Sequence, residues 1–264
     1  MEEGECVNQI IMEDYMTEVI VSKKTLTGED ELPGAFMQII SRDGQVVEEW
    51  ISDTKPHKIR GKLKAGETYI LHEEGTPEGY AYAADLEFTV SKNREPVRAE
   101  MRDGPTCVEI TKTDMTGSEE LEGAVLQVID KNGQVIEEWV SKKEPHKITG
   151  VLKAGETYIL REKAAPEGYG YAADAEFTVS LYGSVCKTVM KDDITRVEII
   201  KADQGTGRPL SGAGFKLQTL DGKVVEEWVS SEEPHKIEGR LKAGETYLLK
   251  ETKAPHSRKK RGGD

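Results

Sequence analysis

The chain has 264 residues, of which 49 are acidic and 36 basic, giving a formal net charge of −13. That length allows two or three small domains, and so acidic a protein is repelled by phosphate backbones, which argues against nucleic acid as a partner. No apolar run approaches the roughly 18 residues that span a membrane, and the acidic N-terminus lacks the pattern of a signal peptide. We therefore expect either a cytosolic protein or a fragment of a longer one.

An internal repeat of 89 residues dominates the sequence: LKAGETY recurs at 63–69, 152–158 and 241–247, and the three tryptophans follow the same step. A unit of this length has the size of a small domain rather than of a solenoid repeat. We therefore expect the following division of the chain: an orphan last strand of a missing preceding repeat within 1–15, complete domains at 17–104 and 106–193, an incomplete domain at 195–256, and a basic disordered tail at 257–264.

The second repeat shows the expected elements most clearly. Short β-rich runs occupy 107–113, 124–130, 134–140, 156–162, 175–179 and 184–190. Asn132-Gly133, like Asp43-Gly44 and Asp221-Gly222 in the other repeats, predicts a hairpin turn between alternating runs. No amphipathic helical pattern of useful length interrupts the runs. Each complete repeat is therefore predicted to be an all-β sandwich of about seven strands.

Alternation along the strands predicts three ionisable side chains on the inward face of each complete repeat. Lys112 follows Val108 and Ile110 at spacing two in the first strand, Glu162 follows Leu160, and Asp192 follows Met190 in the last strand. The 89-residue step gives the equivalent residues Lys23, Glu73 and Asp103 in the first repeat, and Lys201 and Glu251 in the third. The sequence thus predicts a Lys–Glu–Asp cluster in each of the first two repeats.

Two interpretations of these clusters remain open at this point. Each can be a structural buried salt bridge, or a group of side chains at the rim of the sandwich. Alternatively, burial lowers the pKa of the lysine and raises that of the carboxyls, so that a neutral amine can attack the aspartate and form an amide, with the glutamate relaying protons. Because the same cluster recurs in register, we favour the second interpretation, an isopeptide bond between the first and last strands.

The sequence resembles the collagen-adhesin B-type (Cna-B) domain, a prealbumin-like, inverse-immunoglobulin β-sandwich of Gram-positive pilins and surface adhesins. The second repeat carries the resemblance through VEITKTDMTG, LEGAVLQVID, GETYILREKAAPEGY, AEFTV and VMKDD. It covers nearly the whole chain and implies tandem sandwich domains. Many such domains form an intramolecular isopeptide bond between a lysine of the first strand and an Asn or Asp of the last, assisted by an acidic residue.

Carried over by position, the resemblance implies a bond between Lys112 and Asp192 assisted by Glu162. The same positions in the first repeat imply a Lys23–Asp103 bond assisted by Glu73. In the third repeat, Lys201 and Glu251 have no acceptor within the repeat. Asp14 lies in QIIMEDYM, which has the pattern of a last strand, and strand addition between molecules is a hypothesis that could bring it to the third repeat.

The expected function is that of structural stalk repeats of a bacterial cell-surface adhesin or pilin-like protein, extracellular and associated with the cell wall in the parent protein. The alternative is an extracellular module that binds a host protein or glycan. We expect no enzyme beyond the single-turnover crosslinking, no metal or other cofactor, no membrane contact in this fragment, and a monomer. Host matrix or cell-wall components are expected to contact other parts of the parent protein. His57, His146 and His235 are assigned to turns.

Overall fold

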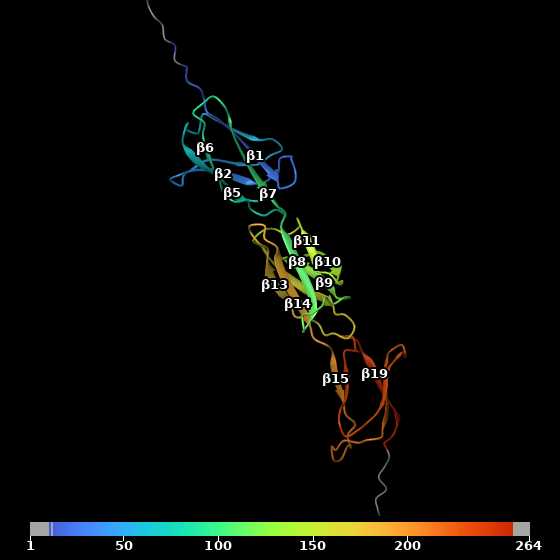
Figure 1. The fold of residues 1–264 in the computed structure, drawn as a ribbon. Coiled ribbons are helices and arrows are strands. Elements are labelled where there is room, and N and C mark those ends of the chain that lie inside the picture. Colours follow the sequence, from blue (N-terminus) through green and yellow to red (C-terminus); the bar gives the residue numbers. More distant parts are fainter. Residues whose placement is uncertain (1–10, 12, 256–264) are drawn as a thin grey trace, which may run out of the picture. The chain divides into compact units, whose positions relative to one another are not determined.

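The computed structural model describes residues 11 and 13–255, and over these residues the chain folds into strands and turns without a helix (Figure 1). The predicted all-β class is therefore confirmed. None of the described residues forms a helix that could cross a membrane. By internal contacts, the chain divides into two compact units: one runs to Val108 and adds Ile148–Glu156 and Thr178–Cys186, and the other comprises Glu109–Lys147, Thr157–Phe177 and the remainder.

The first repeat forms two mostly antiparallel sheets, with the strand orders β4-β1-β7 and β3-β2-β5-β6. Side chains from both sheets, among them Val19, Met37, Leu71 and Met101, are at most 3% exposed and form one hydrophobic core between the sheets. The seven strands are β1 (Glu18–Thr25), β2 (Phe36–Ser41), β3 (Val46–Ile51), β4 (His57–Arg60), β5 (Thr68–Gly75), β6 (Leu86–Thr89) and β7 (Val97–Asp103).

The first and last strands of this repeat are neighbours. β1 pairs with β4 in antiparallel fashion over Glu18–Val21 and with β7 in parallel fashion over Val19–Thr25. In the second pairing Lys23 lies opposite Met101, and Thr25 lies opposite Asp103. The part of β1 beyond Val21 thus pairs with β7 and, at Lys24, with Glu31 through an isolated antiparallel bridge.

The second repeat has the same two strand orders, β11-β8-β14 and β10-β9-β12-β13. The glycine of its Asn132-Gly133 pair has a φ of 82°, which an L side chain rarely adopts, and the chain turns there between β9 and β10 as predicted. Its strands are β8 (Cys107–Asp114), β9 (Val125–Ile129), β10 (Val135–Val140), β11 (His146–Thr149), β12 (Thr157–Ala164), β13 (Ala175–Thr178) and β14 (Cys186–Asp192).

The third repeat has five strands among its described residues, and each of its sheets is one strand narrower. The strand orders are β15-β18 and β17-β16-β19, so equivalents of β7 and β6 are absent from residues 195–255. Its buried core cluster is small, consisting of Leu217, Ile237 and Leu241. The strands are β15 (Arg196–Ile199), β16 (Gly214–Thr219), β17 (Val224–Val229), β18 (His235–Glu238) and β19 (Tyr247–Lys253).

The predicted terminal segments fall mostly outside the described residues, which exclude 1–10, 12 and 256–264. Residues 13–17, the described end of the predicted orphan strand and its junction with β1, are not in a strand. The orphan strand, the basic tail at 257–264 and the exact domain boundaries therefore stay predictions.

Candidate functional site

A lysine, a glutamate and an aspartate meet inside the first repeat. Lys23 comes from β1, Glu73 from β5 and Asp103 from the end of β7, and the three residues are 2%, 3% and 0% exposed. Lys23 Nζ donates a hydrogen bond to Asp103 Oδ1 and lies 3.0 Å from Glu73 Oε1. Alternation along β1 and β7 places these charges in line with the core residues Val21 and Met101, as the sequence predicts.

The second repeat contains the same triad. Lys112 of β8, Glu162 of β12 and Asp192 of β14 are 1%, 6% and 1% exposed. Lys112 Nζ donates to Asp192 Oδ1 and lies 2.9 Å from Glu162 Oε1. The structure thus brings together the three predicted residues in both complete repeats, in one arrangement.

A hydrogen bond from a backbone amide holds the glutamate of each triad in position. The amide of Ala83 donates to Glu73 Oε2 at 3.0 Å, and the amide of Ala172 donates to Glu162 Oε2 at 2.8 Å. The other oxygen of each glutamate is thereby left to face the lysine. Ala83 and Ala172 are related by the 89-residue step, but they lie in loops where alternation does not indicate the direction of an amide, so this anchoring was not predicted.

A second glutamate, which the sequence interpretation overlooked, binds the backbone of each triad lysine. Glu31 Oε2 accepts a hydrogen bond from the Lys23 amide, and Glu120 Oε2 accepts one from the Lys112 amide, both at 2.9 Å. Glu31 and Glu120 are related by the 89-residue step, which is the signal that could have identified them. They fix the backbone from which the lysine side chain enters the core.

Burial changes the protonation of the two aspartates. It is the largest cause raising the pKa of Asp103 to about 7; the neighbouring Lys23 opposes the rise and Glu73 adds to it. In the second repeat, burial likewise raises the pKa of Asp192 to about 6, opposed by Lys112 and supported by Glu162. Near neutral pH each aspartate is therefore close to its titration midpoint, unlike an exposed carboxyl.

Each triad also contains a buried aspartate oxygen without a hydrogen-bond partner, Asp103 Oδ2 in the first repeat and Asp192 Oδ2 in the second. Glu73 Oε1 and Glu162 Oε1 contact the lysine as ion pairs but make no aligned hydrogen bond. An unsatisfied buried acceptor is costly, and a proton on one carboxyl would give the pair a donor. The fully charged triad consists of a lysine ammonium and two carboxylates. The arrangement therefore favours the addition of one proton to this fully charged state.

The third repeat holds only part of this arrangement. Lys201 Nζ lies 2.9 Å from Glu251 Oε2, but the two side chains are 30% and 34% exposed, and no aspartate of the described repeat pairs with Lys201. The alternation predicted Lys201 on the inward face of the first strand; instead β15 ends at Ile199 and the lysine lies beyond it. Asp14 is exposed and outside any strand.

The repeated histidines are not in turns, and this prediction was wrong. His57, His146 and His235 each begin a strand, β4, β11 or β18, that the sequence interpretation missed. Their rings stack on Trp50, Trp139 and Trp228 with centroid separations of 4.2 to 4.3 Å. The proline directly before each histidine favoured a turn over a strand, although the repeated Trp and His positions were visible.

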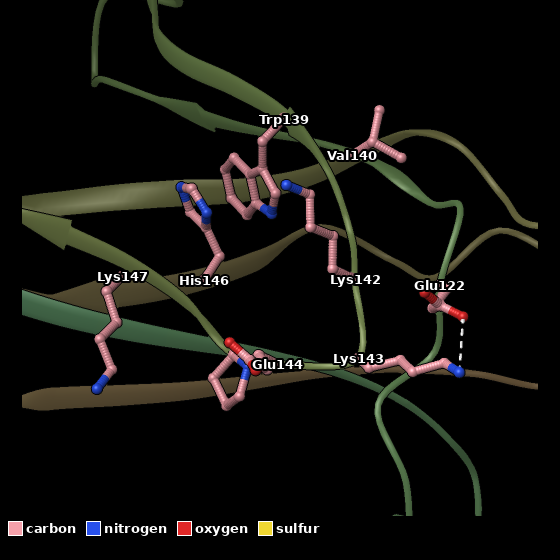
Figure 2. Close-up of a pocket in the computed structure, with 9 residues that line it drawn as sticks. Glu122, Trp139, Val140, Lys142, Lys143, Glu144, His146 and Lys147 are labelled. Carbon is pink, nitrogen blue, oxygen red and sulfur yellow. Dashed lines mark ion pairs between the residues drawn. The ribbon is translucent and has the colours of Figure 1, made fainter.

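A surface hollow surrounds one of these stacks, that of Trp139 and His146 (Figure 2). Lys142, Lys143 and Lys147 line it, and Lys143 lies 3.9 Å from Glu122 across its rim. None of its lining residues belongs to a triad. Among the described residues, no three His, Cys, Asp or Glu side chains form a cluster that could hold a metal ion.

Comparison with known proteins gives one family and several solved structures. The model of the SpaA prealbumin-like fold domain matches residues 17–105, 106–194 and 195–261. No curated protein gives a significant match. The solved structure of the Bacillus anthracis TIE protein is similar at 22% identity and a TM-score of 0.45; the match covers 92% of this chain, which spans only 46% of that protein.

Two pilin structures are also similar to this chain. BcpA, the major pilin subunit of Bacillus cereus, matches at 16% identity and a TM-score of 0.37, covering 94% of this chain and 91% of that one. The shaft pilin SpaA of Lactobacillus rhamnosus GG matches at 16% identity and a TM-score of 0.32, covering 68% and 98%. These values are too low to carry a function from one protein to the other. The family model, by contrast, matches most of the sequence in three consecutive copies, so the chain belongs to the SpaA prealbumin-like fold domain family.

Proposed function

We propose that this chain consists of stalk repeats of a bacterial cell-surface adhesin or pilin-like protein, and that each of its first two repeats is closed by an autocatalytic isopeptide bond. The observation that carries the proposal is the buried triad, which has the same geometry in both repeats. In each, the lysine lies on the first strand and the aspartate on the last strand. The bonds join Lys23 to Asp103 and Lys112 to Asp192, with Glu73 and Glu162 as the proton-relaying residues.

The reaction needs no group from outside the triad. Neutral Nζ attacks the carbonyl carbon of the protonated aspartate; the new C–N bond forms, one C–O bond breaks, and the oxygen leaves as water. The glutamate, held by a backbone amide, passes a proton from the attacking amine to the departing hydroxyl. Fixing the amine against the carboxyl supplies the high effective concentration that this otherwise slow condensation requires.

The competing interpretation is a permanent buried ion pair. Removing two charges from water costs several kcal/mol per ion, and their attraction often only offsets that cost. Here the raised pKa of each aspartate, together with an aspartate Oδ2 atom that has no hydrogen-bond partner in each triad, supports the view that the charged triad is poorly satisfied. Formation of a neutral amide removes both charges, so the burial that penalises the ion pair favours the product.

The bond would lie in the path of a pulling force. A force applied at the two ends of the first repeat enters through β1 and leaves through β7, the two strands that the triad connects. With Lys23 bonded to Asp103, the force passes along residues 18–23, through the side-chain amide, and out of the repeat. Residues 24–102 carry none of it, so the sandwich need not unfold under tension. This is the mechanical property that a stalk requires.

The bond would also stabilise each repeat against unfolding without force. Lys23 and Asp103 are 80 positions apart, as are Lys112 and Asp192. By the loop-closure relation used for disulfides, a link closing so long a loop is worth roughly 4–5 kcal/mol through its effect on the unfolded chain. In this proposal the protein is structural and extracellular, and host or cell-wall components bind elsewhere in the parent protein.

Peptide mapping tests the proposal at the level of single residues. After proteolysis, tandem mass spectrometry should find branched peptides that join Lys23 to Asp103 and Lys112 to Asp192. Glu73→Ala should remove the first branch and Glu162→Ala the second. The neighbouring exposed residues give matched controls, Glu74→Ala and Lys163→Ala, which should keep both branches. Linear peptides alone in the unmodified chain would contradict the proposal.

The alternative function, an extracellular ligand-binding module, has one observation in its favour. The hollow beside Trp139 presents Lys142, Lys143 and Lys147 in an otherwise acidic chain (Figure 2). The first two of these lysines are replaced by Asp53 and Thr54 in the first repeat and by Ser231 and Glu232 in the third. Binding of a host matrix protein that is lost in a Lys142→Glu/Lys143→Glu chain would favour this alternative.

A further inference from the structure

The lysine of the first triad lies beyond the end of one neighbouring strand. β4 pairs with β1 only over Glu18–Val21, so Lys23 lies past the last residue of β1 that β4 contacts. A short segment takes over on this side: the amide of Leu32 donates to the Lys23 carbonyl at 2.6 Å, and Glu31 Oε2 accepts a hydrogen bond from the Lys23 amide at 2.9 Å. Two consecutive residues thus bind both backbone groups of the lysine, one of them through its side chain.

The second repeat has the same arrangement. The amide of Leu121 donates to the Lys112 carbonyl at 2.6 Å, and Glu120 Oε2 accepts a hydrogen bond from the Lys112 amide at 2.9 Å. An isolated antiparallel bridge between Glu120 and Thr113 adds to this contact. The glutamate, the leucine and the lysine therefore make the same hydrogen bonds in both repeats that contain a buried triad.

A buried serine holds this segment independently of the glutamate. Ser52 Oγ donates to the Leu32 carbonyl at 2.6 Å and accepts a hydrogen bond from the Ala35 amide at 2.8 Å. Ser141 and Ser230 make the equivalent two hydrogen bonds in the other repeats. The position of the segment is therefore fixed in all three repeats by a side chain other than the glutamate.

The third repeat shows what the segment does without the glutamate. Pro209 stands at that position and has no carboxylate, yet the Leu210 amide still donates to the Lys201 carbonyl at 2.7 Å. The bond to the lysine carbonyl therefore does not need the glutamate, whereas the bond to the lysine amide does. Removal of Glu31 should accordingly leave the segment in place and release only the Lys23 amide.

A released amide at this point would disturb the geometry of the reaction. Lys23 is 2% exposed, and a buried amide without an acceptor is costly, so the backbone would shift toward another partner. Asp103, by contrast, belongs to β7 and would stay in place. Amide formation needs Nζ close to the carboxyl carbon and aligned with it, and a misplacement of about 1 Å can cost roughly a hundredfold in rate.

We propose that Glu31 and Glu120 are positioning residues for the isopeptide reaction: by binding the amide of the lysine, each holds Nζ against the aspartate carboxyl. The inference rests on the chemistry of the proposed function and leaves its bond-forming step unchanged. Nζ itself contacts the glutamate and the aspartate of the triad in both repeats. Glu31 and Glu120 act through the backbone, and proton transfer stays with Glu73 and Glu162.

The test compares two bonds in the same molecule. The whole chain is made by chemical synthesis, folded for the first time by dilution from denaturant, and sampled over time, and peptide mapping gives the fraction of each branched peptide. In Glu31→Ala, the rate of the first-repeat branch relative to the second should fall roughly ten- to a hundredfold. Glu120→Ala should slow the second branch instead. Asp30→Ala and Glu119→Ala change the exposed neighbours of the two glutamates and are matched controls that should keep the unmodified ratio.

Rescue by glutamine separates positioning from the effect of a charge. The side-chain oxygen of glutamine can accept the same hydrogen bond, so Glu31→Gln should restore most of the rate that Glu31→Ala loses. Hydrogen exchange in a Glu73→Ala background, where the first bond cannot form, measures whether the fold itself is weakened. In that background, the addition of Glu31→Ala should leave the protection of β2 and β5 unchanged.

Three results would overturn the inference. They are an unchanged ratio of the two branches in Glu31→Ala, a Glu31→Gln chain as slow as the alanine variant, and a loss of protection throughout β2 and β5. Each of these leaves the proposed function standing, because the unmodified chain still forms both branches. An unmodified chain that forms neither branch would instead contradict the proposed function itself, and this inference with it.

Discussion

The buried triads and the open Lys–Glu pair share a sequence motif but differ in their surroundings. Leu71 and Leu160, two positions before the glutamates, are fully buried, whereas the equivalent Leu249 is 41% exposed. The Lys–Glu separation is nevertheless nearly the same in all three repeats, 2.9 to 3.0 Å. The lysine and glutamate are therefore paired even without the last strands. The last strands supply both the aspartate and the burial.

This difference separates two effects: the positioning of the lysine beside the glutamate, and the burial that raises the pKa of the aspartate. In the first two repeats burial is the main cause of the raised aspartate pKa, and it is burial that makes the charged triad costly. In the third repeat the pair remains partly hydrated, so the ion pair can persist without that cost. In our proposal, a complete sandwich is the condition under which the same residues react.

Pulling single molecules should give the largest contrast between the repeats. The first two repeats should not lengthen, whereas the third should unfold at low force because no bond closes it. In a Glu73→Ala chain, one new step should appear as the 80 positions between Lys23 and Asp103 extend. At about 3.3–3.6 Å per residue, that step is roughly 260–290 Å. A step of that size for each complete repeat in the unmodified chain would show that the bonds are absent.

Equilibrium stability should change by the loop-closure amount in one repeat only. Glu73→Ala should lower the free energy of unfolding of the first repeat by roughly 4–5 kcal/mol. Hydrogen exchange followed by mass spectrometry reads each repeat separately and should find the second repeat unchanged. The Glu74→Ala control, whose side chain is 56% exposed, should leave both repeats as they are. Equal losses in the Glu73 and Glu74 variants would remove the special role of Glu73.

Truncation of the equivalent leucines should reveal the difference in packing. Leu71→Ala removes a fully buried side chain and should cost the first repeat about 2–5 kcal/mol. Leu249→Ala acts on a half-exposed side chain and should cost the third repeat about 1 kcal/mol or less. Hydrogen-exchange rates measured in urea give both losses of stability. Similar costs would mean that the third repeat is packed as tightly as the first.

Bond formation should slow as the pH rises above neutrality. The competent triad holds two protons among its three groups, which allows a neutral amine beside a protonated aspartate. Above the raised pKa of Asp103, about 7, the aspartate loses its proton and becomes a carboxylate, which an amine does not attack. The rate should fall about tenfold per pH unit there. A chemically synthesised chain, folded for the first time by dilution from denaturant, allows this measurement; a rate that rises with pH would contradict the assignment.

Much of the candidate site was predictable because alternation and repetition reinforce one another. A single lysine in line with Val19 and Val21 is ambiguous, but its recurrence at Lys112 in the same pattern indicated an inward-facing group. The loop amides of Ala83 and Ala172 recur at the 89-residue step, but alternation does not indicate where a loop amide points. The short strands β4, β11 and β18 were missed because a proline directly precedes each of them and favours a turn.

The placement of Lys201 shows why strand ends are hard to predict from local sequence. Its residues alternate as those of β1 do, yet β15 ends at Ile199. The equivalent residues of β1 beyond Val21 pair with the strand β7, and Lys24 also forms an isolated bridge with Glu31. Strand formation there depends on a partner far along the chain, and the local pattern does not contain that information.

The most direct test of the central claim is the intact mass of the folded and then denatured chain. Our account predicts a monomer lighter than the sequence by two waters, one for each buried triad. Glu73→Ala and Glu162→Ala should each restore one water relative to the mass calculated for the variant, and the double variant should restore both. A monomer with the full mass of its sequence would show that the triads are ion pairs, and would contradict the account.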